Sequence, residues 1–328
     1  MELSREAFED LLGAYALDAC EPEESDAIER YAEAHPEARP EVERLREVAA
    51  GIGAADATRP PFDLRERLLV SAGQRVPPMS AEGVLEKETD RFDSFLSTLE
   101  EGDLDVRTVN GLTVRELVQH VEAVDRAFVE AAADSTVVFI GAEQVVGITE
   151  RDLPGRAGEP FAETVARFRR TRRDLAGLRE LPESRRVAGY ERDSVLVIRA
   201  FETWTHHDDV RRAIGHDGLA VPEPAAMRAM ADLAMDSLPI ALAVRGSSRP
   251  GITARIVLDG PGGGEWMVPC TAGEIPAEPV AVVIRASVVD WCRRFADRIE
   301  PGAFASAVEG DAELAGELIA AASAFAGL

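Results

Sequence analysis

The sequence predicts a multidomain protein with α and α+β parts: a small N-terminal helical domain, a four-helix bundle and a C-terminal α+β domain. At 328 residues the chain is too long for one ordinary hydrophobic core. Apolar residues recur at helical spacing almost throughout residues 84–216. The residues that follow contain strand-like segments and a glycine-rich turn. We therefore place the domains at 1–55, 84–218 and 219–328, with a linker that carries a short helix at 56–83.

The first domain is predicted to contain three short helices. Phe8, Leu12 and Tyr15 recur at helical spacing, Pro22 lies at the start of a second helix, and a third surrounds Leu45. So small a unit has little hydrophobic core, and we expect it to be stabilised by packing against a partner or against the rest of the chain. The linker contains the proline pairs 60–61 and 77–78, and its short amphipathic helix covers residues 64–70.

Four longer helices are expected in the second domain. Thr113 and Glu116 have the spacing of a capping box at the start of one of them, and Gly215 ends the last. Helices of this length suggest a bundle with room for a metal ion between facing helices. The expected ranges are Leu85–Leu99, Thr113–Ala133, Pro160–Leu178 and Ser194–Gly215.

The third domain is predicted to combine helices with a small sheet. Its strand-like segments are rich in β-branched residues, and the run Gly260–Gly264 fits a turn between two of them. The predicted strands are Ile252–Leu258, Glu265–Val268 and Val280–Arg285, and the predicted helices are Ala225–Leu242, Val288–Asp297 and Ala312–Phe325.

Composition restricts the partners and the compartment. The formal net charge of -24 and the pI near 4.6 disfavour nucleic acid and anionic membranes as partners. Cys20, Cys270 and Cys292 are odd in number and far apart, which argues against a disulfide framework. No apolar run approaches the roughly 20 residues of a membrane span, and the acidic N-terminus does not resemble a signal peptide. We expect a cytoplasmic protein, and the use of arginine in place of lysine hints at an actinobacterial source.

Three side chains form a candidate metal site. Glu202 and His206 are four residues apart, so they share one face of a helix. The apolar members of that face, Val195 and Ile198, predict that it points inward. His120 lies on the inward face of the second bundle helix, between apolar neighbours. Two nitrogens and one carboxylate oxygen would leave a tetrahedral zinc ion with one open position for water or a thiolate.

Burial gives a physical reason for a cation at this place. An unpaired buried carboxylate costs several kcal/mol, and coordination of a divalent cation removes that penalty. Asp209, three residues after His206, could accept its second ring hydrogen and fix the ring. The alternative is a buried hydrogen bond between Glu202 and His206, with His120 as an ordinary core histidine. His207 is expected on the other side of the helix, and the sequence identifies no catalytic or thiol-binding residue.

Two motifs of the second domain resemble those of a known family. The runs 113–120 and 202–215 are similar to the metal motifs of the mycothiol-dependent maleylpyruvate isomerase family, within the DinB-like superfamily of metal-binding bundles. In that family a histidine, then a glutamate and a histidine four apart, hold zinc, and these positions match His120, Glu202 and His206. The pair His207-Asp208 stands where an arginine or an aromatic residue is more usual.

The resemblance extends to the C-terminal domain, because residues 257–266 and 308–311 resemble its sterol-carrier-like fold. It implies a zinc-dependent and mycothiol-dependent isomerase or thiol transferase that acts on a small molecule. The substrate and the oligomeric state are not readable from the sequence.

The first domain resembles a different group. Residues 11–24 and 59–69 are similar to the opening of anti-sigma factor domains and to the segment that follows them. The zinc ligands of that group would fall on Tyr31, His35 and Ala38, so that zinc site is absent. The resemblance implies a sigma factor as a possible partner of residues 1–75. The alternative function is a cytoplasmic anti-sigma factor whose metal-binding domain senses thiol or small-molecule state without turnover. The N-terminal domain could instead be a generic acidic appendage, and the remainder of the chain could be a metal-free scaffold.

Overall fold

The computed structural model describes residues 3–17, 19–55, 77–134, 139–216, 218, 220–277 and 279–323. The chain divides into two compact units, Met1–Leu69 and Val70–Leu328. The helix predicted at residues 64–70 lies outside the described residues. Within the described ranges, none of the helices combines the length and the apolar character that a bilayer span requires.

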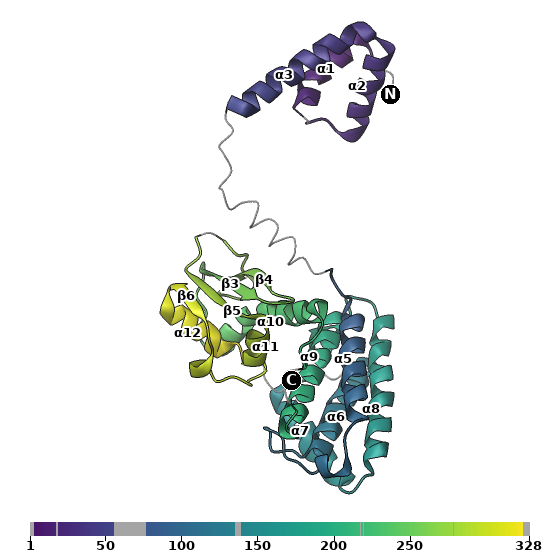
Figure 1. Ribbon diagram of the computed structural model, residues 1–328, viewed down its shortest axis with the longest axis vertical. Coiled ribbons are helices and arrows are strands. Elements are labelled where there is room, and N and C mark those ends of the chain that lie inside the picture. Colours follow the sequence, from purple (N-terminus) through teal and green to yellow (C-terminus); the bar gives the residue numbers. More distant parts are fainter. Residues whose placement is uncertain are drawn as a thin grey trace. The chain divides into compact units, whose positions relative to one another are not determined.

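The N-terminal unit contains the three expected helices (Figure 1). Ser4 caps the first helix by accepting a hydrogen bond from the Ala7 amide at 3.2 Å. The ring of Tyr31 stacks between those of Phe8 and His35, with centroid distances of 4.5 and 4.1 Å. His35 is therefore part of this small aromatic core. The helices are α1 (Arg5–Ala16), α2 (Pro22–Ala34) and α3 (Arg39–Ala55).

Four long helices of the second unit form the predicted bundle (Figure 1). At the start of the second of them, the Thr113 amide donates to Glu116 at 2.8 Å and the Glu116 amide donates to the Thr113 hydroxyl at 3.2 Å, which confirms the capping box. Gly215, with φ of 74°, follows the end of the fourth. The helices are α5 (Ala81–Leu96), α6 (Val114–Ala133), α8 (Phe161–Ala176) and α9 (Arg192–Ala213).

Some elements near the bundle were not predicted. Helix α7 (Ala142–Asp152) buries Val145 alone among its residues, so it has no long apolar stripe in the sequence. The antiparallel hairpin of β1 (Arg186–Val187) and β2 (Tyr190–Glu191) has strands of two residues each, too short for a period-two pattern. Both elements contribute residues around the site described below.

The remainder of this unit is the predicted α+β part. Its four-stranded sheet has the order β4-β3-β5-β6, in which β3 is parallel to β5 and antiparallel to β4. The predicted glycine turn joins β3 to β4, and a Cβ added at Gly262 would lie 2.5 Å from the Pro224 carbonyl oxygen, so only glycine fits this close approach. The strands are β3 (Thr253–Asp259), β4 (Gly264–Pro269), β5 (Val282–Ser287) and β6 (Ala307–Gly310), and the helices are α10 (Pro224–Val244), α11 (Val288–Phe295) and α12 (Ala312–Ala321).

One hydrophobic core connects the bundle with the α+β part. Helix α10 packs against α5 and α9 on one side and against β4 on the other. The buried Trp204 of α9 and Trp291 of α11 belong to the same cluster of apolar side chains. The Trp204 indole also donates to the Ala220 carbonyl at 2.8 Å. The Phe201 ring of α9 and the Phe295 ring of α11 meet edge to face, with centroids 5.3 Å apart, so these two helices contact each other.

Candidate metal centre

His120 of α6 and the pair Glu202 and His206 of α9 come together inside the second unit. One ligand atom from each side chain lies within 4.8 Å of the other two. The two imidazole rings meet edge to face, with centroids 5.2 Å apart. The Nε2 atom of His206 is 3.1 Å from Glu202 Oε2. Elsewhere in the described part of the chain, no group of three histidine, cysteine, aspartate or glutamate side chains is gathered in this way.

The orientation of His206 is set by Asp209. The Nδ1 atom of His206 lies 3.1 Å from Asp209 Oδ2, and Arg298 donates to both oxygens of that carboxylate at 2.8 Å. Burial alone would raise the pKa of Asp209, but the hydrogen bonds from His206 and Arg298 lower it to about 2. Asp209 is therefore an ionised acceptor, and the proton of Nδ1 is directed at it. The other ring nitrogen then faces Glu202.

The surroundings of His206 favour a positive charge at Nε2. Burial lowers the pKa of this imidazole, but the carboxylates of Asp209 and Glu202 outweigh burial and raise it. The Nε2 atom is buried and makes no aligned hydrogen bond. Either a proton or a metal cation can supply the missing charge, so metal binding at this nitrogen would displace a proton.

His120 presents a free lone pair from the opposite helix. The hydroxyl of Thr149 donates to the Val145 carbonyl at 2.8 Å, so its oxygen accepts from His120 Nδ1, which is 2.7 Å away. The proton of the neutral ring is then on Nδ1 and the lone pair on Nε2. Burial, followed by the neighbouring His206, lowers the pKa of His120 to about 3. His120 is thus neutral at pH 7, the form that binds metal.

Glu202 completes the set as a carboxylate. Burial would raise its pKa, but His206 and then Arg199 outweigh burial and lower it. Two imidazole nitrogens and one carboxylate oxygen fit a divalent cation such as zinc, with one coordination position left for a further ligand.

A buried ion cluster ties the helices together next to these residues. Asp125 of α6 lies between Arg199 of α9, with Nε at 2.7 Å, and Arg172 of α8, with Nε at 2.6 Å. All three side chains are buried. Burial lowers the pKa of Arg172 to about 10, so it remains charged at neutral pH. The cluster was not predicted, and the signal for it was an arginine at position 199, one turn before Glu202 on an inward-facing helix.

His207 takes no part in the centre. Its ring lies against Phe92 and Phe95 of α5, with centroid distances of 5.5 and 4.8 Å, on the other side of α9 as predicted. Burial lowers the pKa of His207 to about 3. His216 is exposed at the end of α9.

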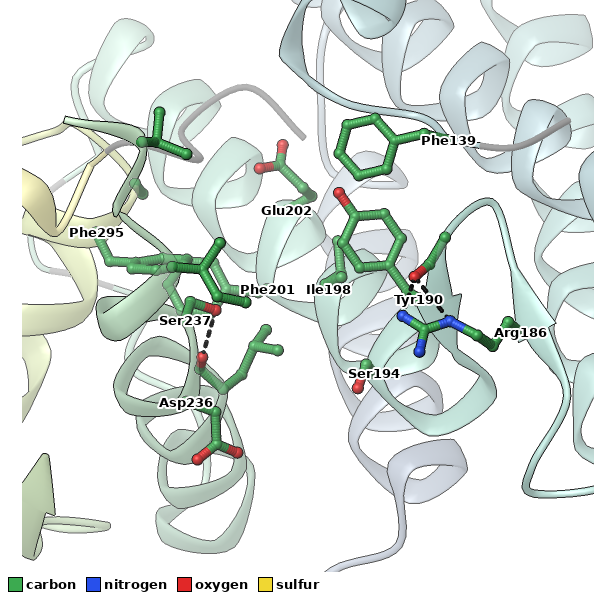
Figure 2. A pocket seen from close by; sticks show the side chains of 15 residues that line it. Phe139, Arg186, Tyr190, Ser194, Ile198, Phe201, Glu202, Asp236, Ser237 and Phe295 are labelled. Carbon is green, nitrogen blue, oxygen red and sulfur yellow. Dashed lines mark hydrogen bonds between the residues drawn. The ribbon is translucent and has the colours of Figure 1, made fainter. Parts of the chain in front are cut away.

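A cavity of about 430 Å³ opens beside Glu202 (Figure 2). Its wall draws on α9, α10, the β1–β2 hairpin, the end of α11 and the segment before α7. In Figure 2, Phe139 and Tyr190 lie on one side of Glu202, and Phe201 and Phe295 lie on the other. Apart from Glu202, none of these lining residues was identified from the sequence, because they come from segments far apart in the chain.

Comparisons with known proteins match part of the chain to one family. Residues 85–211 match the family model of the mycothiol maleylpyruvate isomerase N-terminal domain, and this range includes all three candidate ligands. Solved structures of the mycothiol-dependent maleylpyruvate isomerase and of a mutant of it share 16% identity, with TM-scores of 0.45 and 0.44. Each covers 69% of this chain and 91% of its own. No curated protein matches the chain.

Proposed function

We propose that this chain, in which residues 85–211 belong to the family of mycothiol maleylpyruvate isomerase N-terminal domains, is a zinc-dependent enzyme that uses mycothiol to isomerise a small molecule or to transfer a thiol to it. The observation that carries the proposal is the convergence of His120, Glu202 and His206 beside a cavity. A bound zinc ion would lower the pKa of a thiol and so supply a nucleophile at neutral pH.

The side chains around the centre have separable roles in this proposal. His120 and His206 would hold the ion through Nε2, and Glu202 would neutralise part of its charge. Asp209 fixes the ring of His206, and Arg298 fixes Asp209. The aromatic wall of the cavity would exclude water from the reacting groups.

Metal analysis tests the proposal first. We expect stoichiometric zinc in the purified protein and its loss in Glu202→Ala, because the variant removes the anionic ligand. Glu150→Ala, which removes an exposed carboxylate of α7, is the matched control and should retain zinc. A wild-type protein that neither contains zinc nor takes it up would contradict the proposal.

Turnover is the second test. With mycothiol as the thiol, and with maleylpyruvate and uncharged small molecules as trial substrates, we expect turnover of at least one of them by the zinc-loaded protein and none by His120→Ala. A zinc protein that binds mycothiol but turns over no substrate would instead favour the regulatory alternative, in which the metal-binding domain senses thiol state.

The regulatory alternative would use the N-terminal unit as the part that binds a sigma factor. This part is a separate compact unit with its own aromatic core, and the apolar side chains of Leu17 and Val48 are exposed on it. A sigma factor that co-purifies with the full chain, and is lost on Leu17→Asp and Val48→Asp, would assign residues 1–75 to a regulatory partner.

A further inference from the structure

We propose that the cavity beside Glu202 binds an uncharged, mainly apolar small molecule, so that the substrate of the chain is neutral and not a carboxylate anion. The assignment of this molecule as the substrate rests on the proposed function, whereas the ligand class of the cavity rests on its own wall.

The wall of the cavity is apolar and aromatic. The rings of Phe201 and Phe295 are 5.3 Å apart, and those of Phe139 and Tyr190 are 5.5 Å apart. Figure 2 shows these pairs on opposite sides of Glu202. The volume of about 430 Å³ is within the range of about 300–1,000 Å³ that is usual for small-molecule sites. A ligand held by these rings would have one end next to the candidate metal ligands.

The mouth of the cavity continues this apolar surface. Phe139, Ile240 and Val244 line the cavity and are 50%, 52% and 68% exposed, respectively. Exposed apolar side chains at the edge of a cavity are typical of a binding site for an apolar ligand. The three residues come from α10 and from the segment before α7, so the surface is built by two separate parts of the chain.

The charged groups of the wall disfavour an anion. Among the described residues that line the cavity, Arg186 is the one cation, and the wall also contains two acids, Glu202 and Asp236. The Arg186 guanidinium donates to the Gly189 carbonyl. A divalent cation held by Glu202 and two neutral imidazoles would carry a net charge of +1, which a thiolate in its open position would neutralise. Asp236 would balance Arg186, so no positive charge would then remain for a carboxylate. Burying an anion without a partner costs several kcal/mol.

Two neutral hydroxyl groups of the wall are arranged as acceptors. The Tyr190 hydroxyl donates to the Ile140 carbonyl at 3.1 Å, and the Ser237 hydroxyl donates to the Leu233 carbonyl at 2.7 Å. Their oxygens can therefore accept a hydrogen bond from a ligand but have no second proton to donate. An apolar molecule that carries a hydroxyl or a neutral N–H fits this wall, and a carboxylate, which only accepts, does not.

Two fluorescent probes with one carbon skeleton test the proposal on the full chain. N-phenyl-naphthylamine is neutral and has an N–H donor, and anilinonaphthalene sulfonate adds an anionic group to the same body. We expect the neutral probe to bind at least about tenfold more tightly, a difference of about 1.4 kcal/mol. Val244→Asp, at the exposed mouth, should weaken the neutral probe by about tenfold or more. The control is Val146→Asp, the same substitution at an exposed residue of α7 that does not line the cavity. It should leave the affinity for the neutral probe unchanged.

The charge argument is tested separately. Asp236→Asn should strengthen binding of the sulfonate probe, and Arg186→Gln should not weaken binding of the neutral probe. Equal affinity for the two probes would overturn the proposal. So would an unchanged affinity for the neutral probe in a Val244→Asp variant whose circular dichroism matches that of the wild type.

Zinc content measured on the same samples separates the two proposals. A chain that binds the neutral probe as expected but takes up no zinc would refute the proposed function and leave the ligand class of the cavity standing. A chain that holds zinc but does not bind the neutral probe would refute the ligand class alone.

Discussion

The carboxylate of Asp209 makes the two contacts that decide what His206 can do. It accepts from the Nδ1 of His206 and receives two hydrogen bonds from Arg298, so the ring is held with Nε2 toward Glu202. Partners of this kind commonly contribute about 10-fold to 100-fold to metal affinity. Asp209 was predicted in this role from its spacing, whereas Arg298, 89 positions along the chain, was not.

We expect Asp209→Asn to weaken zinc binding by about 10-fold to 100-fold. The amide is neutral and can present its NH₂ group to His206, which would move the ring proton to Nε2. The measurement is competition with a chelator of known affinity. The matched control is Asp208→Asn, because Asp208 pairs with Arg212 at 2.7 Å and is absent from the cluster of candidate ligands. Equal losses in the two variants would show that charge alone, and not the orientation of the ring, is responsible.

Glu88 of α5 gives the stability a defined pH dependence. Burial raises the pKa of this carboxyl to about 7, although Arg91 opposes the shift. Below the unfolded-state pKa of about 4.3 both states are protonated and Glu88 has no effect. As the pH rises toward 7 the unfolded chain releases the proton first, so the free energy of unfolding falls. Above pH 7 the loss is complete.

Glu88→Gln should therefore raise the free energy of unfolding, and the gain should be about 2 kcal/mol larger at pH 8 than at pH 5.5. Urea denaturation at the two pH values measures it. Glu86→Gln, at an exposed position of the same helix, should show no such difference. A gain that does not change with pH would mean that Glu88 is ionised throughout.

The packing of α6, α8 and α9 depends on the ion cluster of Asp125, Arg172 and Arg199. This cluster brings the helix of His120 and the helix of Glu202 into contact at a level close to the ligands. Asp125 is the one anion among these three side chains and offsets one of the two positive charges. Its removal would leave two buried guanidinium groups without their carboxylate partner.

Asp125→Asn should accordingly lower the free energy of unfolding by about 3 to 5 kcal/mol. Asp90→Asn, at an exposed position of α5, should change it by less than about 0.5 kcal/mol. Chemical denaturation of the second unit measures both. A loss below about 1 kcal/mol for Asp125→Asn would show that water or a rearranged neighbour compensates the two arginines.

The elements that the sequence predicted are those with a long apolar period. Helix α6 has one, and the glycines after β3 mark the turn to β4, whereas α9 is buried on most of its sides. Strand β6 was missed because its four residues are all exposed and it lies at the sheet edge. The three candidate ligands could be selected from the sequence because Glu202 and His206 share one helix and His120 lies in an apolar stripe. The cavity was not found, since its wall is assembled from tertiary contacts among five separate elements.

At the scale of the whole molecule, a metal ion would stabilise one unit and not the other. The three candidate ligands all lie within Val70–Leu328. At free zinc about 100 times the dissociation constant, binding to the folded state adds about 2.7 kcal/mol. Chelation should lower the free energy of unfolding of this unit by that amount, as followed by the fluorescence of Trp204 and its neighbours. Glu202→Ala should show no response to the chelator, and a response that persists in it would place the ion elsewhere.

The short segment from Phe295 to Arg298 contacts both the cavity and the carboxylate that orients His206. Phe295 and Ala296 form part of the cavity wall, Arg298 holds Asp209, and its Nη1 also donates to the Ala296 carbonyl at 2.6 Å. A ligand that displaces residues 295–298 would also shift the Arg298 side chain, which holds Asp209 and so orients the His206 ring. Thermodynamic linkage then requires the metal ion to change the affinity for the ligand by the same factor by which the ligand changes the affinity for the ion. We expect the affinity for the neutral probe to differ with and without zinc in the wild-type chain, and to be the same under both conditions in Arg298→Ala.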